Sequence, residues 1–356
     1  MRIKPVDLFV LVGFLVLISI PLVGSFFSPE GSFEAGSVFT DGLSLPQMVR
    51  GALAYPSEFS QHFQNHYFTH QWQVDLFHAF RYHILGETSF PNVVIGKEDW
   101  LYYSGESNLD DYQCASPFTD NEVETIRTRL ENWDQQLKER GIQFYVVIAP
   151  NKESIYPQFL PDQVRVLPRA CRIDQVMQAM QASPVRVLDL RAGMHTAAQA
   201  SQAYHRTDTH WNAYGALQAS AEILSLLHQN FPQITIPALA DYQQASEDFS
   251  GDLAAFLPGD DRFVEQAIQL DPIHSSGVEI RQGENRTIFA SIEGSDLPSA
   301  VVFRDSFTDA LVPFLSDHFS WVTYVFSFQV EMELVEAEKP DIVILEIAQR
   351  YLTALR

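Results

Sequence analysis

The sequence predicts an α/β fold with a central, mostly parallel sheet that helices cover on both faces. Two observations support this prediction. Short, wholly apolar runs of the kind found in strands buried on both faces recur along the chain. Helical patterns separate most of these runs, which is typical of parallel sheets. The predicted strands cover residues 144–149, 185–190, 300–303, 321–326 and 341–345.

The predicted helices are marked by their termini and by their periodicity. Thr119 and Glu122 have the spacing of a capping box, and apolar residues recur every three or four positions from Val123 until Gly141. We therefore expect a helix over residues 121–140. Further elements are predicted as helices over 213–230, 307–315 and 330–338, a helix pair over 63–85, and two strands over 93–95 and 101–103.

Composition excludes several classes of protein. The 356 residues contain 23 Lys and Arg against 45 Asp and Glu, which gives a formal net charge of −22. Ligands bound by phosphate neutralisation, and nucleic acid above all, are therefore excluded. With 46% hydrophobic and 19% charged residues, the chain has the composition of a folded protein rather than a disordered one.

The N-terminal residues predict export with retention at the membrane. Arg2 and Lys4 precede an apolar run over residues 8–27 that is long enough to cross a bilayer of about 30 Å. This charge pattern places the rest of the chain on the periplasmic side of the cell membrane, and the length of the run favours an uncleaved anchor. We expect an anchor over 1–27, a spacer over 28–60 and one domain over 61–356.

The predicted compartment determines what we expect of the two cysteines. Because the environment outside the membrane is oxidising, Cys114 and Cys171 are candidates for a disulfide, the alternative being two buried free thiols. Their spacing does not resemble that of a zinc site, and we expect no metal or other cofactor.

A serine lies at the end of a predicted strand. Ser306 follows the strand over 300–303 and begins the next helix, whose N-terminal N–H groups are suited to stabilising an oxyanion. The alternative is that Ser306 only caps this helix.

A candidate base lies just before the helix over 213–230. Asp208 is two residues before His210, a spacing that lets the carboxylate accept from one ring nitrogen while the other takes a proton from a serine. Three alternatives remain open. Asp208 caps the helix, His205 joins Asp208 and His210 as metal ligands, or His210 is a core histidine with satisfied hydrogen bonds.

Two further loops follow buried strands and carry polar residues. After the strand over 144–149, Asn151 is a candidate oxyanion donor, and Lys152 is a candidate contact for an acidic sugar or a carboxylate. Ordinary turn chemistry explains Pro150 and Asn151 equally well. After the last strand, Arg350 is a candidate partner of a carboxylate or of the substrate.

Together these motifs resemble the SGNH-hydrolase-like domain of the alginate O-acetyltransferase (AlgX/AlgJ) family, which includes a group named for its Asp-His-His-Trp motif. The matching stretches are residues 94–103, 150–157, 207–216, 251–253, 304–307 and 346–352. The resemblance implies a three-layer α/β/α fold with Ser306 as nucleophile and Asp208 and His210 completing the triad. Trp211 belongs to the same motif and, with Arg304, joins the candidate oxyanion or substrate-binding residues.

The resemblance also implies the reaction. We expect an O-acetyltransferase that acts on an exported polysaccharide, with acetyl groups relayed by a multi-pass (MBOAT-type) membrane acyltransferase. The alternatives are an acetyl esterase with the same triad and a non-catalytic glycan-binding or assembly protein. Arg304 departs from the Gly-Asp-Ser signature of the wider superfamily, and the end of the chain soon after Arg350 favours the membrane-anchored AlgJ type. If the polymer is anionic, we expect the basic residues Lys152, Arg206, Arg304 and Arg350 to attract it locally.

Overall fold

The structure is a computed structural model that describes Leu15 and residues 88–257 and 263–356. The predicted anchor, spacer and helix pair over 63–85 lie outside the described residues, apart from Leu15. Residues Thr88–Arg356 form one compact unit. In the part of the chain that the structure describes, no helix has the length and apolarity needed to cross a membrane.

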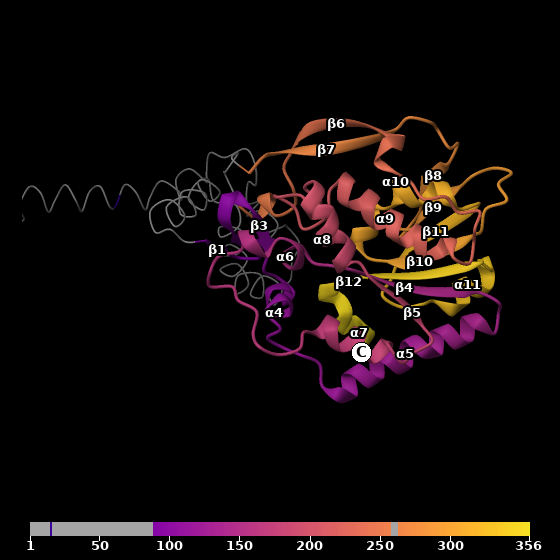
Figure 1. The fold of residues 1–356 in the computed structure, drawn as a ribbon, viewed down its shortest axis with the longest axis horizontal. Helices are drawn as coiled ribbons and strands as arrows, with labels where there is room; N and C mark the ends of the chain where they lie inside the picture. Colours follow the sequence, from indigo (N-terminus) through magenta and orange to yellow (C-terminus); the bar gives the residue numbers. More distant parts are fainter. Residues whose placement is uncertain (1–14, 16–87, 258–262) are drawn as a thin grey trace, which may run out of the picture. The chain divides into compact units, whose positions relative to one another are not determined.

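A seven-stranded sheet forms the centre of this unit, in the order β5-β4-β12-β10-β11-β9-β8 (Figure 1). Neighbours from β5 to β11 pair in parallel, and β9 and β8 extend the sheet in antiparallel pairing. The mostly parallel sheet predicted from the sequence is thus confirmed. The strands are β4 (Gln143–Ala149), β5 (Arg186–Asp189), β8 (Glu279–Gln282), β9 (Ile288–Ser291), β10 (Ala300–Arg304), β11 (Trp321–Phe326) and β12 (Ile342–Ala348).

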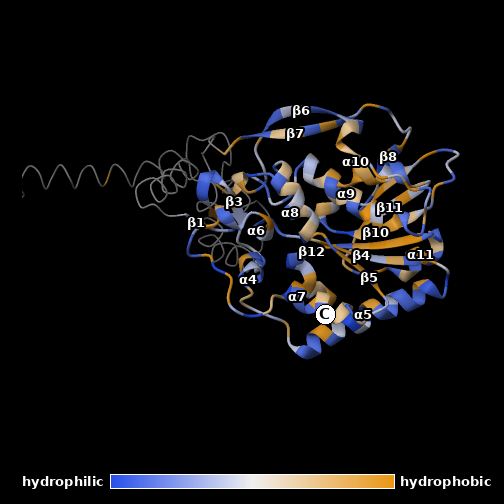
Figure 2. Ribbon diagram, in the orientation of Figure 1, coloured by the Kyte–Doolittle hydropathy of each residue, from blue (hydrophilic) through white to orange (hydrophobic). Residues whose placement is uncertain are grey.

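Helices cover both faces of the sheet because successive side chains of the central strands point to opposite sides. In β4, Phe144, Val146 and Ile148 pack into one core and Tyr145 and Val147 into the other. The central strands are correspondingly the most apolar ribbons in Figure 2. The first core includes α5 (Asp120–Lys138), α7 (Arg172–Met180) and α11 (Met332–Glu338); the second includes α8 (Arg191–Ala200), α9 (Ala213–His228) and α10 (Val312–Leu315).

The predicted helix boundaries are close to those observed. The capping box forms at the start of α5, where Thr119 Oγ1 accepts from the Glu122 backbone N–H at 3.3 Å and Glu122 returns the bond to the Thr119 N–H at 2.8 Å. The helix predicted over 307–315 is instead a 3₁₀ helix, Ser306–Ala310, followed by the short α10. Pro313 lies in the first turn of α10, the position where a helix tolerates proline best.

Two smaller sheets and several short helices complete the unit. The strands predicted over 93–95 and 101–103 are present, joined through a 3₁₀ turn, Lys97–Asp99. A two-stranded ribbon that was not predicted packs against α9. The remaining elements are β1 (Ser89–Phe90), β2 (Val93–Ile95), β3 (Leu101–Tyr103), α4 (Asn108–Tyr112), α6 (Lys152–Ile155), β6 (Tyr242–Phe249), β7 (Glu265–Pro272), and 3₁₀ helices at Pro157–Phe159, Leu239–Asp241, Ala254–Phe256, Ser316–His318 and Gln349–Leu355.

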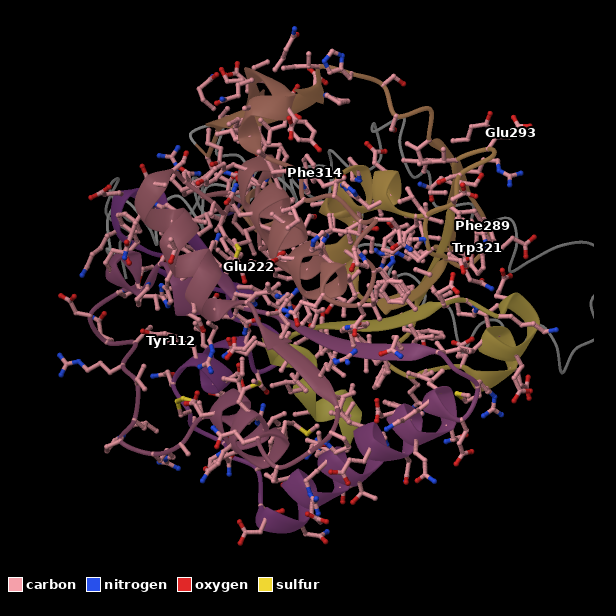
Figure 3. All side chains as sticks on the ribbon, turned by 45° about the vertical axis from the view of Figure 1, so that its right-hand side comes forward. Tyr112, Glu222, Phe289, Glu293, Phe314 and Trp321 are labelled. Carbon is pink, nitrogen blue, oxygen red and sulfur yellow. A yellow bond between two sulfur atoms is a disulfide. The ribbon has the colours of Figure 1, made fainter. Side chains whose placement is uncertain are left out.

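The antiparallel end of the sheet differs from the parallel part in its exposure. Phe289 on β9 and Trp321 on β11 lie beside each other on one face, and Phe289 is 38% exposed (Figure 3). By contrast, every residue of β10 and β12 is buried. The most protected part of the sheet is therefore the part whose carboxyl ends carry the predicted site residues.

Candidate active site

The turn after β10 places Ser306 at the carboxyl end of the central strand. Asp305 caps the following 3₁₀ helix, because its Oδ1 accepts from the Phe307 backbone N–H at 2.8 Å. Asp305, and not Ser306, therefore provides the helix cap that the sequence left as an alternative role for Ser306. The Ser306 hydroxyl points instead to His210, with Oγ 2.9 Å from Nε2.

The other side of His210 is held by Asp208. Asp208 Oδ1 lies 2.7 Å from Nδ1 of His210 and also accepts from the His210 backbone N–H at 3.0 Å. With the proton on Nδ1, Nε2 is free to accept the serine proton. Both side chains are partly accessible, 25% for His210 and 13% for Asp208. The structure thus brings Asp208, His210 and Ser306 together, although Asp208 and Ser306 are 98 positions apart in the chain (306 − 208).

The environment of Asp208 favours its charged form. Burial alone would raise the pKa of this carboxyl, but the hydrogen bond and charge of His210, together with the backbone N–H groups of Asp252 and His210, outweigh burial and lower it. Asp208 therefore stays ionised at neutral pH and holds one orientation of the imidazole.

Lys152 holds the loop that carries Asp208 and His210, which is called the histidine loop below (residues 205–210). Its ammonium donates to the carbonyls of His205, Arg206 and Asp208 at 3.1, 3.3 and 2.6 Å. Three N–H groups thus meet three carbonyls, and burial lowers the pKa of this amine to about 8. The side chain is 2% exposed and its ammonium is taken up by these carbonyls, so in this structure Lys152 supports the loop and does not face solvent.

Two carboxylates bind backbone N–H groups of the same loop. Glu265 on β7 accepts from the backbone N–H groups of Arg206 and Thr207 at 2.9 and 2.8 Å. Asp252 accepts from the Thr209 N–H at 2.9 Å and donates its own N–H to Asp208. A Cβ on Gly251 would lie 2.4 Å from that of Asp208, so only glycine lets the two loops approach this closely.

A pair of buried carboxyls supports the turn over residues 305–307, which is called the serine turn below. Besides capping Phe307, Asp305 accepts from the Ala348 N–H at 2.7 Å, and Glu346 on β12 accepts from the Asp305 N–H and from Thr308 Oγ1 at 3.2 and 2.8 Å. Burial raises the pKa of both carboxyls, and that of Glu346 rises further because Asp305 is beside it. Since Asp305 already accepts from two backbone N–H groups, the proton resides on Glu346.

Three other residues that were predicted to contact an oxyanion or substrate have buried side chains whose polar groups bind other parts of the protein. Asn151 is 0% exposed and directs its amide to Asp111. Arg304 is 1% exposed and donates to Asp309 Oδ1 at 2.6 Å and to the Arg286 carbonyl at 2.9 Å. Trp211 is 1% exposed and donates Nε1–H to the carbonyl of Phe307 at 3.0 Å, which ties the histidine loop to the serine turn.

The guanidinium of Arg350 lies among three aromatic rings. Its Cζ is 5.2 Å from the ring centroid of Phe307, 4.9 Å from that of Tyr351 and 5.8 Å from that of Tyr103. The backbone N–H of Arg350 donates to Asn151 at 3.3 Å, which fixes the start of this segment.

Comparison with known proteins now decides the family. A family model described as the SGNH hydrolase-like domain of acetyltransferase AlgX matches residues 93–320, more than half of the chain. The chain belongs to this family. Within it, the probable alginate O-acetylase AlgJ of Pseudomonas syringae pv. tomato is 23% identical over 280 residues, or 74% of this chain and 70% of that protein. The relative of the same name from Pseudomonas fluorescens is 26% identical over 64% of this chain and 56% of its own length.

Solved structures show that the AlgX family fold is shared more widely. Bacillus cereus PatB1 with a sulfonyl adduct has a TM-score of 0.57 at 15% identity, covering 75% of this chain and 96% of that one. A DHHW family protein from Eubacterium siraeum has a TM-score of 0.53 at 14% identity, covering 74% and 93%. At these identities the likeness concerns the fold.

The alternatives considered for the histidine loop fit the structure of this AlgX family member less well. Helix α9 is capped by Asn212, which accepts from the Gly215 N–H, so Asp208 is not its cap. His205 stacks on Phe249 at 4.1 Å instead of joining a ligand set. Asp208, His210 and Asp252 do converge, but their inward-facing atoms are already hydrogen-bonded to one another or to Thr209.

The two carboxylates that bind the histidine loop are the part of the site that the sequence did not reveal. Glu265 lies in a strand that was not predicted, and its partners are 58 and 59 positions away. Asp252 belongs to a matching motif, but nothing local assigns it to Thr209.

The disulfide Cys114–Cys171 is present, with Cα atoms 4.5 Å apart, and joins the end of α4 to the start of α7.

Proposed function

We propose that this chain is an O-acetyltransferase that moves an acetyl group through an ester on Ser306. The observation that carries the proposal is the contact of Ser306 Oγ with His210 Nε2 at 2.9 Å while Asp208 holds Nδ1. Membership of the AlgX acetyltransferase family and the name of the AlgJ relatives support acetyl transfer as the reaction.

Two balanced half-reactions make up the mechanism. In the first, Ser306 Oγ attacks the acetyl carbonyl, His210 takes the hydroxyl proton, and the leaving oxygen of the donor receives that proton as its bond to the acetyl carbon breaks. In the second, a sugar hydroxyl attacks the carbonyl of the acetyl-serine and His210 takes the hydroxyl proton. His210 returns that proton to Ser306 Oγ as the bond between Oγ and the acetyl carbon breaks, which leaves the acetyl ester on the sugar. The backbone N–H of Ser306, at the start of the 3₁₀ helix, is the proposed oxyanion donor, worth about 10² to 10³ in rate.

The proposed setting is the periplasmic side of the cell membrane. The apolar run over residues 8–27 with Arg2 and Lys4 before it supports an N-terminal anchor, and the disulfide is typical of an oxidising compartment. Because acetyl-CoA is absent there, the donor is proposed to come through a multi-pass MBOAT-type membrane acyltransferase. The acceptor is an exported polysaccharide, and alginate is the first to test because the relatives are named for it.

Acetylation of the native polysaccharide tests the proposal in cells. Replacing the chromosomal copy with Ser306→Ala should abolish acetylation while the protein level stays normal, and Ser320→Ala, in the turn before β11, is the matched control. Unchanged acetyl content with Ser306→Ala would refute the proposal. A serine-directed fluorophosphonate should label the wild type and not the Ser306→Ala variant.

An assay with purified protein separates transfer from hydrolysis, since an acetyl esterase would use the same three residues with water as acceptor. Release of the chromophore from p-nitrophenyl acetate should rise when an oligosaccharide acceptor is added, and acetyl groups should appear on the sugar. Turnover that is independent of acceptor, with free acetate as the product, would identify an esterase instead.

A further inference from the structure

The seven-stranded sheet ends in two edges that differ in how far they are covered. At one edge, β5 is mostly half-buried, and its Asp189 pairs with Arg191 at 2.7 Å. At the other edge, every residue of β8 is exposed, and neither Glu279 nor Arg281 has an ion pair or a side-chain hydrogen bond among the described residues. An exposed edge strand is a template on which another strand can pair.

The backbone groups that β8 leaves free follow from its pairing with β9. Gly283, just after β8, donates its N–H to the Thr287 carbonyl at 2.8 Å, toward β9. The direction of the backbone polar groups alternates along an antiparallel strand. Those of Arg281 therefore also face β9, whereas those of Ile280 and Gln282 face away from the sheet.

The charges of β8 favour one way of pairing this strand with a second copy of itself. In an antiparallel pair about a two-fold axis, outward-facing backbone groups must meet each other. With Ile280 on the axis, the two Ile280 residues exchange both backbone hydrogen bonds, and Glu279 of each copy lies directly opposite Arg281 of the other. The two neighbouring registers place either Arg281 or Glu279 on the axis, where like charges lie directly opposite each other and repel.

The side chains on and beside β8 suit the register with Ile280 on the axis. Glu279 and Arg281 then occupy a non-hydrogen-bonded pair, in which opposite Cα atoms are only about 4.5 Å apart and the side chains come close together. Ile280 projects from the other face, is 43% exposed, and would be covered by Ile280 of the second copy. Phe289, which is 38% exposed, is the partner of Arg281 on β9 and flanks the ion pair (Figure 3).

We propose that β8 is a homodimer interface, through which two copies of this chain join their sheets edge to edge with Ile280 on the two-fold axis. A second copy fits better than an unrelated strand, because the order acid, apolar residue, base is complementary to itself. The strand β10, which leads to Ser306, is separated from β8 by β11 and β9, so the pairing does not use the strand that carries the proposed nucleophile. Because this interface is small, we expect a weak dimer with a Kd of roughly 10 to 100 μM.

Sedimentation equilibrium of the full-length chain tests the dimer directly. Detergent micelles keep the apolar run over residues 8–27 in solution, and about 0.15 M salt screens the repulsion between two copies that each carry a charge of −22. The protein should change from monomer to dimer over the stated range of Kd. A chain that stays monomeric up to roughly 500 μM would overturn the proposal, and this is also the result expected if another segment of the same chain covers β8.

Exchange of the two charges tests the pairing of Glu279 with Arg281. Glu279→Arg and Arg281→Glu each place like charges opposite each other, so either variant alone should dimerise about tenfold more weakly than the wild type. An equimolar mixture of the two variants should recover the wild-type Kd, because each arginine again lies opposite a glutamate. The double variant should recover it for the same reason. A mixture that dimerises no better than its components would contradict the proposal.

The matched control for charge is Glu333→Arg, at an exposed position of α11. It changes the net charge by the same amount as Glu279→Arg and should leave the Kd unchanged. Because the substituted side chains are exposed, every variant should unfold at the wild-type temperature when circular dichroism is measured at about 1 μM, where all of them are monomeric. An equal loss of dimer in Glu333→Arg would show that net charge, and not the contact at β8, controls association.

Disulfide cross-linking measures the register independently. Both native cysteines are in the disulfide Cys114–Cys171, so an introduced cysteine is the only free thiol of its chain. Glu279→Cys and Arg281→Cys, mixed and oxidised with copper phenanthroline, should form a disulfide-linked heterodimer on a non-reducing gel. Either variant alone should stay unlinked, because its two cysteines lie diagonally, about 7 to 8 Å apart. Efficient linkage of one variant alone would place that residue on the axis and refute the proposed register, and no linkage in the mixture would refute the interface.

Discussion

The two halves of the candidate site are held in different ways. The serine turn continues directly from β10, the central strand of the sheet, and is fixed by the buried carboxyls of Asp305 and Glu346. The histidine loop lies outside regular structure and is held by an ammonium and two carboxylates that bond to its backbone, from Lys152, Glu265 and Asp252. A backbone that is not in a sheet or helix requires side chains to satisfy its polar groups.

This difference indicates where the site is sensitive to charge. Removing the charge of a group that holds the histidine loop leaves buried carbonyl or N–H groups without partners, which is costly. The serine turn is supported from β12 by Glu346, a carboxyl that is already neutral, so removal of this ionisable group costs little. The following variants test this contrast, from the largest expected effect to the smallest.

Asp208→Asn should have the largest effect. The amide places a donor where Nδ1–H needs an acceptor, so His210 presents the wrong tautomer to Ser306. We expect kcat for acetyl transfer to fall by about 10⁴-fold. Stopped assays with p-nitrophenyl acetate measure this fall in kcat. Circular dichroism checks that the variant is folded under the assay conditions. A loss below tenfold would mean that Asp208 does not orient the base.

Lys152→Met should reduce kcat by roughly tenfold to a hundredfold, because three carbonyls of the histidine loop lose their donor and Asp208 is displaced. Lys138→Met, at an exposed lysine near the end of α5, is the control and should change neither kcat nor thermal stability. Wild-type kcat in Lys152→Met would show that Glu265 and Asp252 suffice to hold the loop.

The same lysine predicts opposite trends of activity and stability with pH. Its pKa is about 8 in the folded protein, against 10.5 ordinarily, and Glu153, Asp208, Glu265 and Asp252 all act to keep it charged. Between these values the unfolded chain binds more protons, so this group makes the folded state more stable as pH rises. The neutral amine has one donor fewer, so kcat should fall above pH 8. This decrease should be absent from the pH profile of Lys152→Met.

Trp211→Phe tests the link between the two halves. The indole N–H donates to the Phe307 carbonyl, and phenylalanine keeps most of the ring packing without that bond. We expect a loss of about 1 kcal/mol in the free energy of unfolding and a fall in kcat of several-fold. Urea denaturation and steady-state kinetics measure the two effects. A change in stability with no change in kcat would show that the halves are positioned independently.

Glu346→Gln should have the smallest effect on kcat, within about threefold at pH 7, because a neutral amide replaces an acid that already holds its proton. The raised pKa means that the folded protein binds more protons than the unfolded chain above pH 4.5, so the wild type loses stability as pH rises. The melting temperature of the variant relative to the wild type should therefore increase from pH 5 to pH 8. A relative decrease would place the proton elsewhere.

Local patterns were sufficient for the parts of the fold that are buried or capped. The strand Gln143–Ala149 is apolar throughout, and α5 begins at the predicted capping box. The ribbon β6–β7 was missed because β6 is exposed on both faces, with residues such as Gln243, Gln244 and Glu247, so it has no apolar alternation.

The candidate site divides in the same way. Ser306, Asp208 and His210 were predicted because each lies within a short motif at the end of a strand or the start of a helix. Whether Lys152, Asn151 or Arg304 points into the protein or toward solvent depends on carbonyls and carboxylates from distant segments, and no spacing along the chain reports this. Charged residues beside a nucleophile were therefore assigned to substrate when most of them support the backbone.

The position of β10 in the sheet has a consequence for how this enzyme can diverge. Because β10 pairs with β12 on one side and β11 on the other, the serine backbone has almost no freedom to shift during evolution without disturbing five parallel strands. New acceptors must therefore be accommodated by segments that are not part of the sheet, such as the turn after β3 and the C-terminal 3₁₀ helix. Exchanging those two segments between homologues is the most direct route to altered acceptor choice.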